Sequence, residues 1–211
     1  MASLFRMTAG ILGWLALALQ YWLVMTGNIG PEPIERSINF FSYFTILTNI
    51  LAALALTLPW LAPQSAPGQF FSRPSVRTAI ATYIIIVMAI TYLVLRHLSN
   101  LEGWYVVADL ILHYIMPILF VIDWLFLVPK DTLKPKDVIV WLAFPILYVI
   151  WTIIHGALSG FYPYPFLNVG ELGYARVLMN MVVLLAIFLI LGLLLVTGGR
   201  LIDKARRANA A

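Results

Sequence analysis

The sequence predicts an all-α integral membrane protein, a single domain over residues 1–211 built as a bundle of six transmembrane helices. Hydrophobic residues make up 63% of the chain and charged residues only 10%. Such a composition leaves too little polar surface for a water-soluble domain. The hydropathy divides into six stretches of roughly 20 apolar residues, the length that crosses a bilayer. The expected spans are 5–25, 38–60, 77–98, 104–127, 137–158 and 174–198.

The first span, 5–25, has a single basic residue, Arg6, at its beginning and is longer than the apolar core of a signal peptide. No Ala-x-Ala pattern follows it, so we expect it to be retained. The second and third spans are separated by residues 61–76, which are rich in Pro, Ser and Gln and typical of a flexible linker.

Proline interrupts the fourth and fifth spans at Pro117 and Pro145, and each ring should bend its helix because it removes a backbone donor. Before the sixth span, residues 159–173 are aromatic and apolar. This loop should either lie at the lipid headgroups as an anchor or fold over the bundle.

Basic residues orient the chain. Short loops of helical membrane proteins carry more Lys and Arg on the cytoplasmic side. The N-terminus, the second and fourth connections and the C-terminal tail hold ten of them, against three in the other connections. The ten are Arg6, Arg73, Arg77, Lys130, Lys134, Lys136, Arg200, Lys204, Arg206 and Arg207, and the three are Arg36, Arg96 and Arg176. Both termini are therefore expected in the cytoplasm.

Polar side chains inside spans are costly in lipid and usually mark function. Most lie in the expected outer halves of the helices. Ser42, Thr45 and Asn49 follow i, i+3, i+7 spacing and should form one polar stripe that faces inward. With a rise of about 1.5 Å per residue, Thr45 and His113 lie at comparable depths on different helices, so they can meet.

Asp109 and His113 are spaced i, i+4, which brings a carboxylate within reach of an imidazole. The carboxylate would fix the tautomer of a proton-accepting histidine, and a hydroxyl beside it would become a nucleophile. Structural roles are the alternatives: Thr and Ser bond back to their own helix, and Asp109 pairs with Arg96 or Arg176.

The remaining ionisable residues inside spans have structural or interfacial roles among their expectations. Asp123 is expected at the membrane interface, and His155 is either a second site residue or a structural group that binds loop carbonyls. The chain has no cysteine, which excludes disulfides and thiolate chemistry. We expect no metal, no cofactor and no nucleic-acid partner.

Three stretches resemble the androgen-induced integral-membrane hydrolases, which cleave fatty acid esters of hydroxy fatty acids, and their bacterial relatives. These are Phe-Ser-Tyr-Phe-Thr at 41–45, Asp109-Leu-Ile-Leu-His113 followed by Pro117, and Tyr148-Val-Ile-Trp-Thr-Ile-Ile-His155 through Gly160 to Tyr164-Pro-Phe-Leu167. The resemblance covers nearly the whole chain in layout. It implies a nucleophilic threonine at Thr45, an essential histidine at His113 and a bacterial cytoplasmic membrane location.

The sequence hypothesis is therefore an intramembrane lipid-ester hydrolase with a cavity in the outer leaflet. Thr45 would be the nucleophile, His113 the general base and then acid, and Asp109 the group that orients His113. Candidates for substrate binding or for the oxyanion donors are Ser42, Asn49, His155, Arg176 and Asn180. The substrate would be a membrane lipid or a fatty-acyl ester.

Two alternatives stay open at this stage. Asp109, His113 and Arg176 could form an ion or proton relay in a small transporter or channel. His113 and His155 could instead be the axial ligands of a haem.

Overall fold

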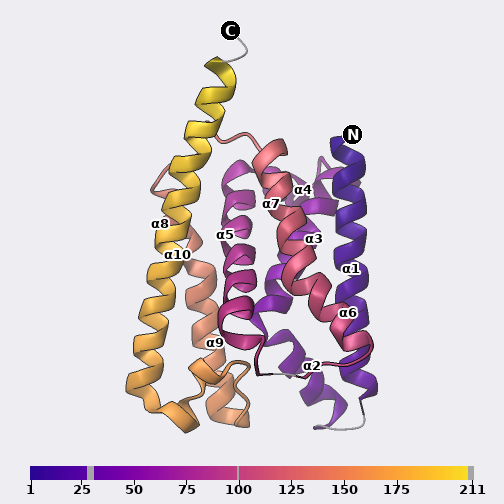
Figure 1. Ribbon diagram of the computed structural model, residues 1–211, viewed down its shortest axis with the longest axis vertical. Helices are drawn as coiled ribbons and strands as arrows, with labels where there is room; N and C mark the ends of the chain where they lie inside the picture. Colours follow the sequence, from indigo (N-terminus) through magenta and orange to yellow (C-terminus); the bar gives the residue numbers. More distant parts are fainter. Residues whose placement is uncertain (28–30, 99, 209–211) are drawn as a thin grey trace.

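The computed structural model describes residues 1–27, 31–98 and 100–208, and its regular secondary structure in these ranges is helical. Within them, six helical segments are long and apolar enough to cross a membrane, as predicted. The segments are α1 (Ala2–Thr26), α3 (Phe44–Leu61), Pro74–Leu95, Trp104–Leu127, Asp137–Ser159 and α10 (Val169–Ala208). They lie side by side, and α1 begins at the end of the bundle where α10 finishes (Figure 1).

Three of these segments are composite. The third is α5 (Pro74–Ile90) followed by a π turn, η1 (Thr91–Leu95). The fourth is α6 (Trp104–Leu110), a second π turn, η2 (Ile111–Ile115), and α7 (Met116–Leu127). The fifth is α8 (Asp137–Trp141) and α9 (Ala143–Ser159). The short helices α2 (Pro33–Phe41), α4 (Ala66–Ser72) and η3 (Pro165–Leu167) lie in connections.

The continuous helix expected over 38–60 is wrong. Helix α2 ends at Phe41, Ser42 and Tyr43 are not helical, and α3 begins at Phe44. The expected polar stripe is therefore divided, because Ser42 lies at the end of one helix while Thr45 and Asn49 lie on the next.

The last span begins where the sequence predicted, at residue 174. Gly173 has φ 74° and ψ 158°, which interrupts the helical path, and a regular helix runs on from Tyr174. This backbone conformation favours glycine, since a side chain would be strained there. The helix then continues to Ala208, beyond the expected end at 198.

Small residues let α1 approach its neighbours closely. A Cβ added to Gly10 would lie 2.5 Å from Cγ2 of Thr57 on α3, and one added to Gly13 would lie 2.7 Å from Cε of Met116 on α7. Close backbone approach of this kind supplies van der Waals packing between helices in lipid, where the hydrophobic effect gives little.

A buried charge cluster joins the helices at the end that carries the termini. The Asp123 carboxylate is fully buried, and it binds Arg6 at 2.6 Å and Arg77. Arg77 also donates to the backbone oxygen of Ala55 at 2.7 Å. Asp123 is therefore buried within the protein: the carboxylate ties α1, α5 and α7 together, and its charge is compensated by two guanidinium groups.

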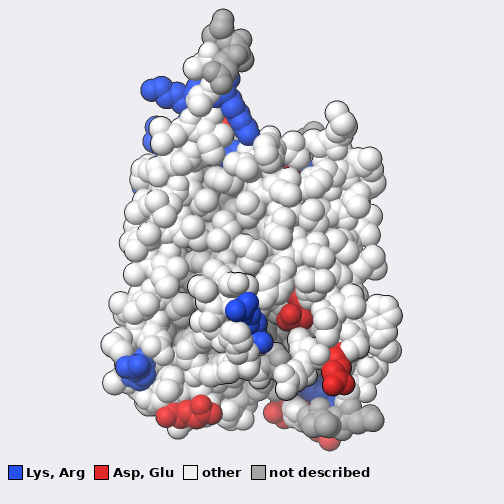
Figure 2. Space-filling view, viewed as in Figure 1, with Lys and Arg blue, Asp and Glu red and all other residues white. Residues whose placement is uncertain are grey.

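Charge is uneven along the bundle. On the face in Figure 2, Lys and Arg gather near the C-terminus, acidic residues and further basic residues lie toward the opposite end, and the area between is largely uncharged. An uncharged band between two charged ends suits a multi-pass integral membrane protein.

Candidate functional site

The break between α2 and α3 creates the site. It leaves backbone groups without helical partners, and side chains from distant segments bind them. The Tyr148 hydroxyl on α9 donates to the Ser42 carbonyl oxygen at 3.1 Å. The Trp151 indole N–H donates to the Ser42 hydroxyl at 3.0 Å, and that hydroxyl donates to the carbonyl of Ile38 at 2.8 Å. Ser42 therefore holds α9 against the break and lines neither of the cavities described below.

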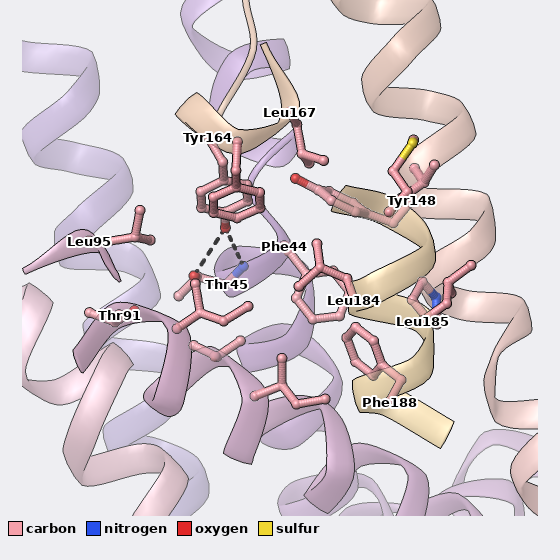
Figure 3. Close-up of a pocket in the computed structure, with 17 residues that line it drawn as sticks. Phe44, Thr45, Thr91, Leu95, Tyr148, Tyr164, Leu167, Leu184, Leu185 and Phe188 are labelled. Atoms are coloured by element: carbon pink, nitrogen blue, oxygen red, sulfur yellow. Dashed lines mark hydrogen bonds between the residues drawn. The ribbon is translucent and has the colours of Figure 1, made fainter. Parts of the chain in front are cut away.

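Thr45 lies in the first turn of α3, directly after the break, and is 6% exposed. Its backbone N–H donates to the hydroxyl of Tyr164 at 3.3 Å, and its Oγ1 lies 3.3 Å from the same hydroxyl. Both contacts are drawn in Figure 3. Tyr164 belongs to the 159–173 loop. This loop folds over the bundle, which is one of the two positions expected for it, and it buries Tyr164 and Leu167.

Two cavities meet at Thr45. The first has a volume of about 50 Å³ and an apolar wall built from α3, α5, α9, α10 and η3, including Phe44, Leu184 and Phe188 (Figure 3). The second is much larger, about 880 Å³, and lies at the end of the bundle opposite the termini. Its wall contains polar and charged groups. Residues shared by both walls are Thr45, Thr91, Leu95 and Tyr164.

His113 and Asp109 line the larger cavity. The imidazole Nδ1 lies 2.8 Å from Oδ1 of Asp109 and 3.2 Å from the backbone oxygen of the same residue. Both neighbours accept hydrogen bonds, so the neutral ring carries its proton on Nδ1 and Nε2 is left as the proton acceptor. The side chains of His113 and Asp109 are 19% and 32% exposed, so both are open to the larger cavity.

His113 lies within the π turn η2. The Met116 N–H bonds to the carbonyl of Ile111, five residues back, so the Leu112 carbonyl loses its usual helical partner. Pro117 has no N–H to offer the carbonyl of His113. Turns of this kind are frequent at functional sites, and η1 contributes Thr91 and Leu95 to both cavities.

Thr45 and His113 line the larger cavity from different helices, α3 and η2. Among the hydrogen bonds of the described residues none joins them directly, and the Thr45 hydroxyl is occupied by Tyr164. Catalytic hydrogen bonds are often long or absent without substrate.

Asn49 is committed to the backbone. Its amide nitrogen donates to the carbonyl of Thr45 at 2.9 Å and to the carbonyl of Leu112 at 3.0 Å. The second bond satisfies the carbonyl that η2 leaves free. With both amide hydrogens used, Asn49 has no donor for an oxyanion.

The other candidate donors also lie outside both cavities. His155 binds the Asn39 side chain at 2.9 Å and stacks on Trp151. Asn180 donates to the carbonyl of Phe166 at 2.9 Å. Arg176 is exposed on α10. The relay of Asp109, His113 and Arg176 is therefore not assembled, and His155 does not share a cavity with His113 as a haem-ligand pair would require.

Two arginines complete the wall of the larger cavity. Arg36 donates to the carbonyls of Met25, Gly27 and Pro31. Arg96 lies 4.0 Å from the ring centre of Tyr92. In the described ranges Asp109 pairs with His113 rather than with either arginine, and no group of three His, Asp or Glu side chains there could hold a metal ion.

Neither protein-family models, curated proteins nor solved structures give a match to this chain.

Sequence reasoning missed Tyr164, η1 and η2. Tyr164 belongs to one of the stretches that carry the family resemblance, but it is one aromatic residue of a loop rich in them, and nothing in the sequence points to its contact with Thr45. No residue within 91–95 or 111–116 indicates a π turn. The one signal nearby is Pro117, just after the second range.

Proposed function

We propose that this protein is an intramembrane hydrolase of lipid esters, with Thr45 as nucleophile and His113 as general base. The observation that carries the proposal is the position of Thr45, where an apolar cavity meets a larger one whose wall includes polar groups, among them the His113–Asp109 pair. An ester whose chain is dissolved in the bilayer has its reacting carbonyl at such a boundary. The resemblance of residues 41–45 and 109–117 to the androgen-induced hydrolases points to the same chemistry.

The reaction follows from the arrangement. The Thr45 oxygen attacks the ester carbonyl carbon, and its proton passes to Nε2 of His113, directly or through a water in the cavity. The carbonyl electron pair moves to oxygen and then returns as the ester C–O bond breaks. The departing alcohol takes the proton from His113. Water then attacks the acyl-threonine, again with His113 as base. The bond from the acyl carbon to the Thr45 oxygen breaks, His113 returns the proton to that oxygen, and the acid is released.

The proposed location in the membrane rests on the distribution of basic residues. The end of the bundle that carries the termini holds ten Lys and Arg, so we place it in the cytoplasm and the larger cavity in the outer leaflet of a bacterial cytoplasmic membrane. Membrane lipids or fatty-acyl esters are then the substrates, and nucleic acids are not partners.

The test uses purified protein with a fluorophosphonate probe, p-nitrophenyl esters and a fatty acid ester of a hydroxy fatty acid. The probe should label Thr45, as mapped by mass spectrometry. Thr45→Ser should keep part of the turnover because the hydroxyl remains. Thr45→Val should lose labelling and lower kcat by about 10³-fold or more.

Thr48→Val is the matched control. Thr48 is fully buried on the same helix, lines neither cavity, and its hydroxyl has no hydrogen-bond partner among the described residues. The control should hydrolyse like the wild type. Full activity of Thr45→Val with unchanged thermal unfolding would disprove the assignment of the nucleophile.

A further inference from the structure

We infer that Tyr164 is a catalytic residue whose hydroxyl donates the hydrogen bond that stabilises the oxyanion. This inference rests on the proposed hydrolase function. It identifies a donor that acyl transfer needs and that none of the sequence candidates supplies.

The contact with the nucleophile carries the argument. The Tyr164 oxygen accepts the backbone N–H of Thr45 and lies at the same distance, 3.3 Å, from Oγ1 of Thr45 (Figure 3). Because the N–H occupies a lone pair of the phenol, the phenol proton is free to point toward Oγ1. In the tetrahedral intermediate Oγ1 and the oxyanion are bonded to the same carbon. The oxyanion therefore forms next to an atom to which this hydroxyl can already donate.

The donors that the sequence suggested are engaged elsewhere or lie away from Thr45. Both amide hydrogens of Asn49 bind backbone carbonyls. His155, Asn180 and Arg176 lie outside both cavities. Among the described residues, only Tyr164 has a side-chain O–H in hydrogen-bond contact with Oγ1 of Thr45.

The surroundings of Tyr164 hold this hydroxyl in place before substrate arrives. The ring is 8% exposed and stacks on Phe166, with ring centres 5.3 Å apart and planes 4° from parallel. The carbonyl of Phe166 is in turn fixed by Asn180 of α10. A donor that is already oriented costs no reorganisation when charge develops.

The protonation state suits a donor. Burial raises the pKa of Tyr164 to about 12. The phenol therefore keeps its proton across the physiological range.

Tyr164 exchanges no proton in the reaction. As Thr45 attacks, the carbonyl electron pair moves to oxygen and the phenol O–H shifts its hydrogen bond from Oγ1 to that oxyanion. When the pair returns and the ester C–O bond breaks, the hydrogen bond weakens again.

The experiment compares Tyr164→Phe with the wild type. We expect kcat to fall by about 10²-fold, as for the loss of one oxyanion donor, with KM little changed. The affinity for a trifluoromethyl ketone, which forms a charged tetrahedral adduct with the nucleophile, should fall by a similar factor as kcat/KM. Tyr162→Phe is the control, because it removes a hydroxyl from the same loop that has no hydrogen-bond partner among the described residues.

The outcomes separate the two proposals. If Thr45→Val is inactive but Tyr164→Phe keeps wild-type kcat, the oxyanion role is overturned and the hydrolase stands. A fall in kcat without a matching loss of ketone affinity also overturns it, because a purely structural role would act in this way. If Thr45→Val hydrolyses like the wild type, both proposals fail together.

Discussion

At the scale of single residues, His113 receives its orientation from one neighbour through two atoms. The side-chain oxygen of Asp109 lies 2.8 Å from Nδ1, and the backbone oxygen lies 3.2 Å away. Replacing the carboxylate by an amide leaves the backbone acceptor in place. The tautomer with a free Nε2 is thus favoured by helix geometry as well as by charge, and only the stabilisation of the imidazolium depends on the carboxylate.

This arrangement predicts unequal effects of two substitutions. Asp109→Asn should lower kcat by about tenfold, whereas His113→Gln should lower it by about 10³-fold, within the range that a general base contributes. Glu102→Gln, an exposed carboxylate-to-amide change at the same end of the bundle, should have no effect. The measurement is kcat for an ester that the wild type cleaves. Equal losses for Asp109→Asn and His113→Gln would mean that the backbone oxygen does not hold the ring.

The residues that the sequence identified differ in how well their roles could be predicted. The Asp109–His113 contact follows from i, i+4 spacing. The depth of Thr45 was predicted from the rise of one continuous helix, whereas the chain breaks just before it and Thr45 lies in the first turn of α3. The direction of Asn49, His155 and Asn180 does not follow. It depends on which carbonyls and amides lie free on neighbouring helices, and these are set by breaks and π turns elsewhere in the bundle.

At the scale of elements, the same reason explains why the span positions could be predicted but the α2–α3 break could not. Residues 40–45 contain no Gly or Pro, so local sequence favours a continuous helix. The break is stabilised by distant side chains, Tyr148 on the Ser42 carbonyl and Tyr164 on the Thr45 amide. A single helix in lipid could not leave these groups unpaired.

The π turn η2 has a comparable support in Asn49. Asn49→Leu should leave the buried carbonyl of Leu112 without a donor and lower the free energy of unfolding by about 1–3 kcal/mol. It should also reduce activity, because His113 lies in that turn. Thermal unfolding in detergent together with kcat provides the measurement. Thr48→Val, which removes a neighbouring buried hydroxyl that binds nothing among the described residues, should be neutral or stabilising.

If Asn49→Leu left stability unchanged, the Leu112 carbonyl would have another donor, and η2 would not depend on α3. If stability fell but kcat did not, the turn would hold its shape without the amide, and the link between η2 and the position of His113 would be disproved.

At the scale of the whole molecule, the two ends of the bundle are built differently. The end with the termini is joined by the buried cluster of Arg6, Arg77 and Asp123. The opposite end is hollowed by the cavity of about 880 Å³. Removing one member of a buried charge cluster is far more costly than altering an exposed pair. The stabilising contacts and the proposed chemistry therefore occupy opposite ends, which lets the second end carry breaks and π turns.

The charge distribution predicts which end faces the cytoplasm. Ten Lys and Arg and four Asp lie toward the end with the termini, against three Arg and five acidic residues toward the other. Because the chain has no cysteine, single-thiol variants report topology directly. Gln64→Cys and Glu102→Cys introduce exposed thiols in connections at the two opposite ends. A membrane-impermeant maleimide applied to intact cells should label Glu102→Cys alone, and both variants should react after lysis. Labelling of Gln64→Cys in intact cells would reverse the orientation and move the cavity with Thr45 and His113 to the cytoplasmic leaflet, where its substrates would have to be sought instead.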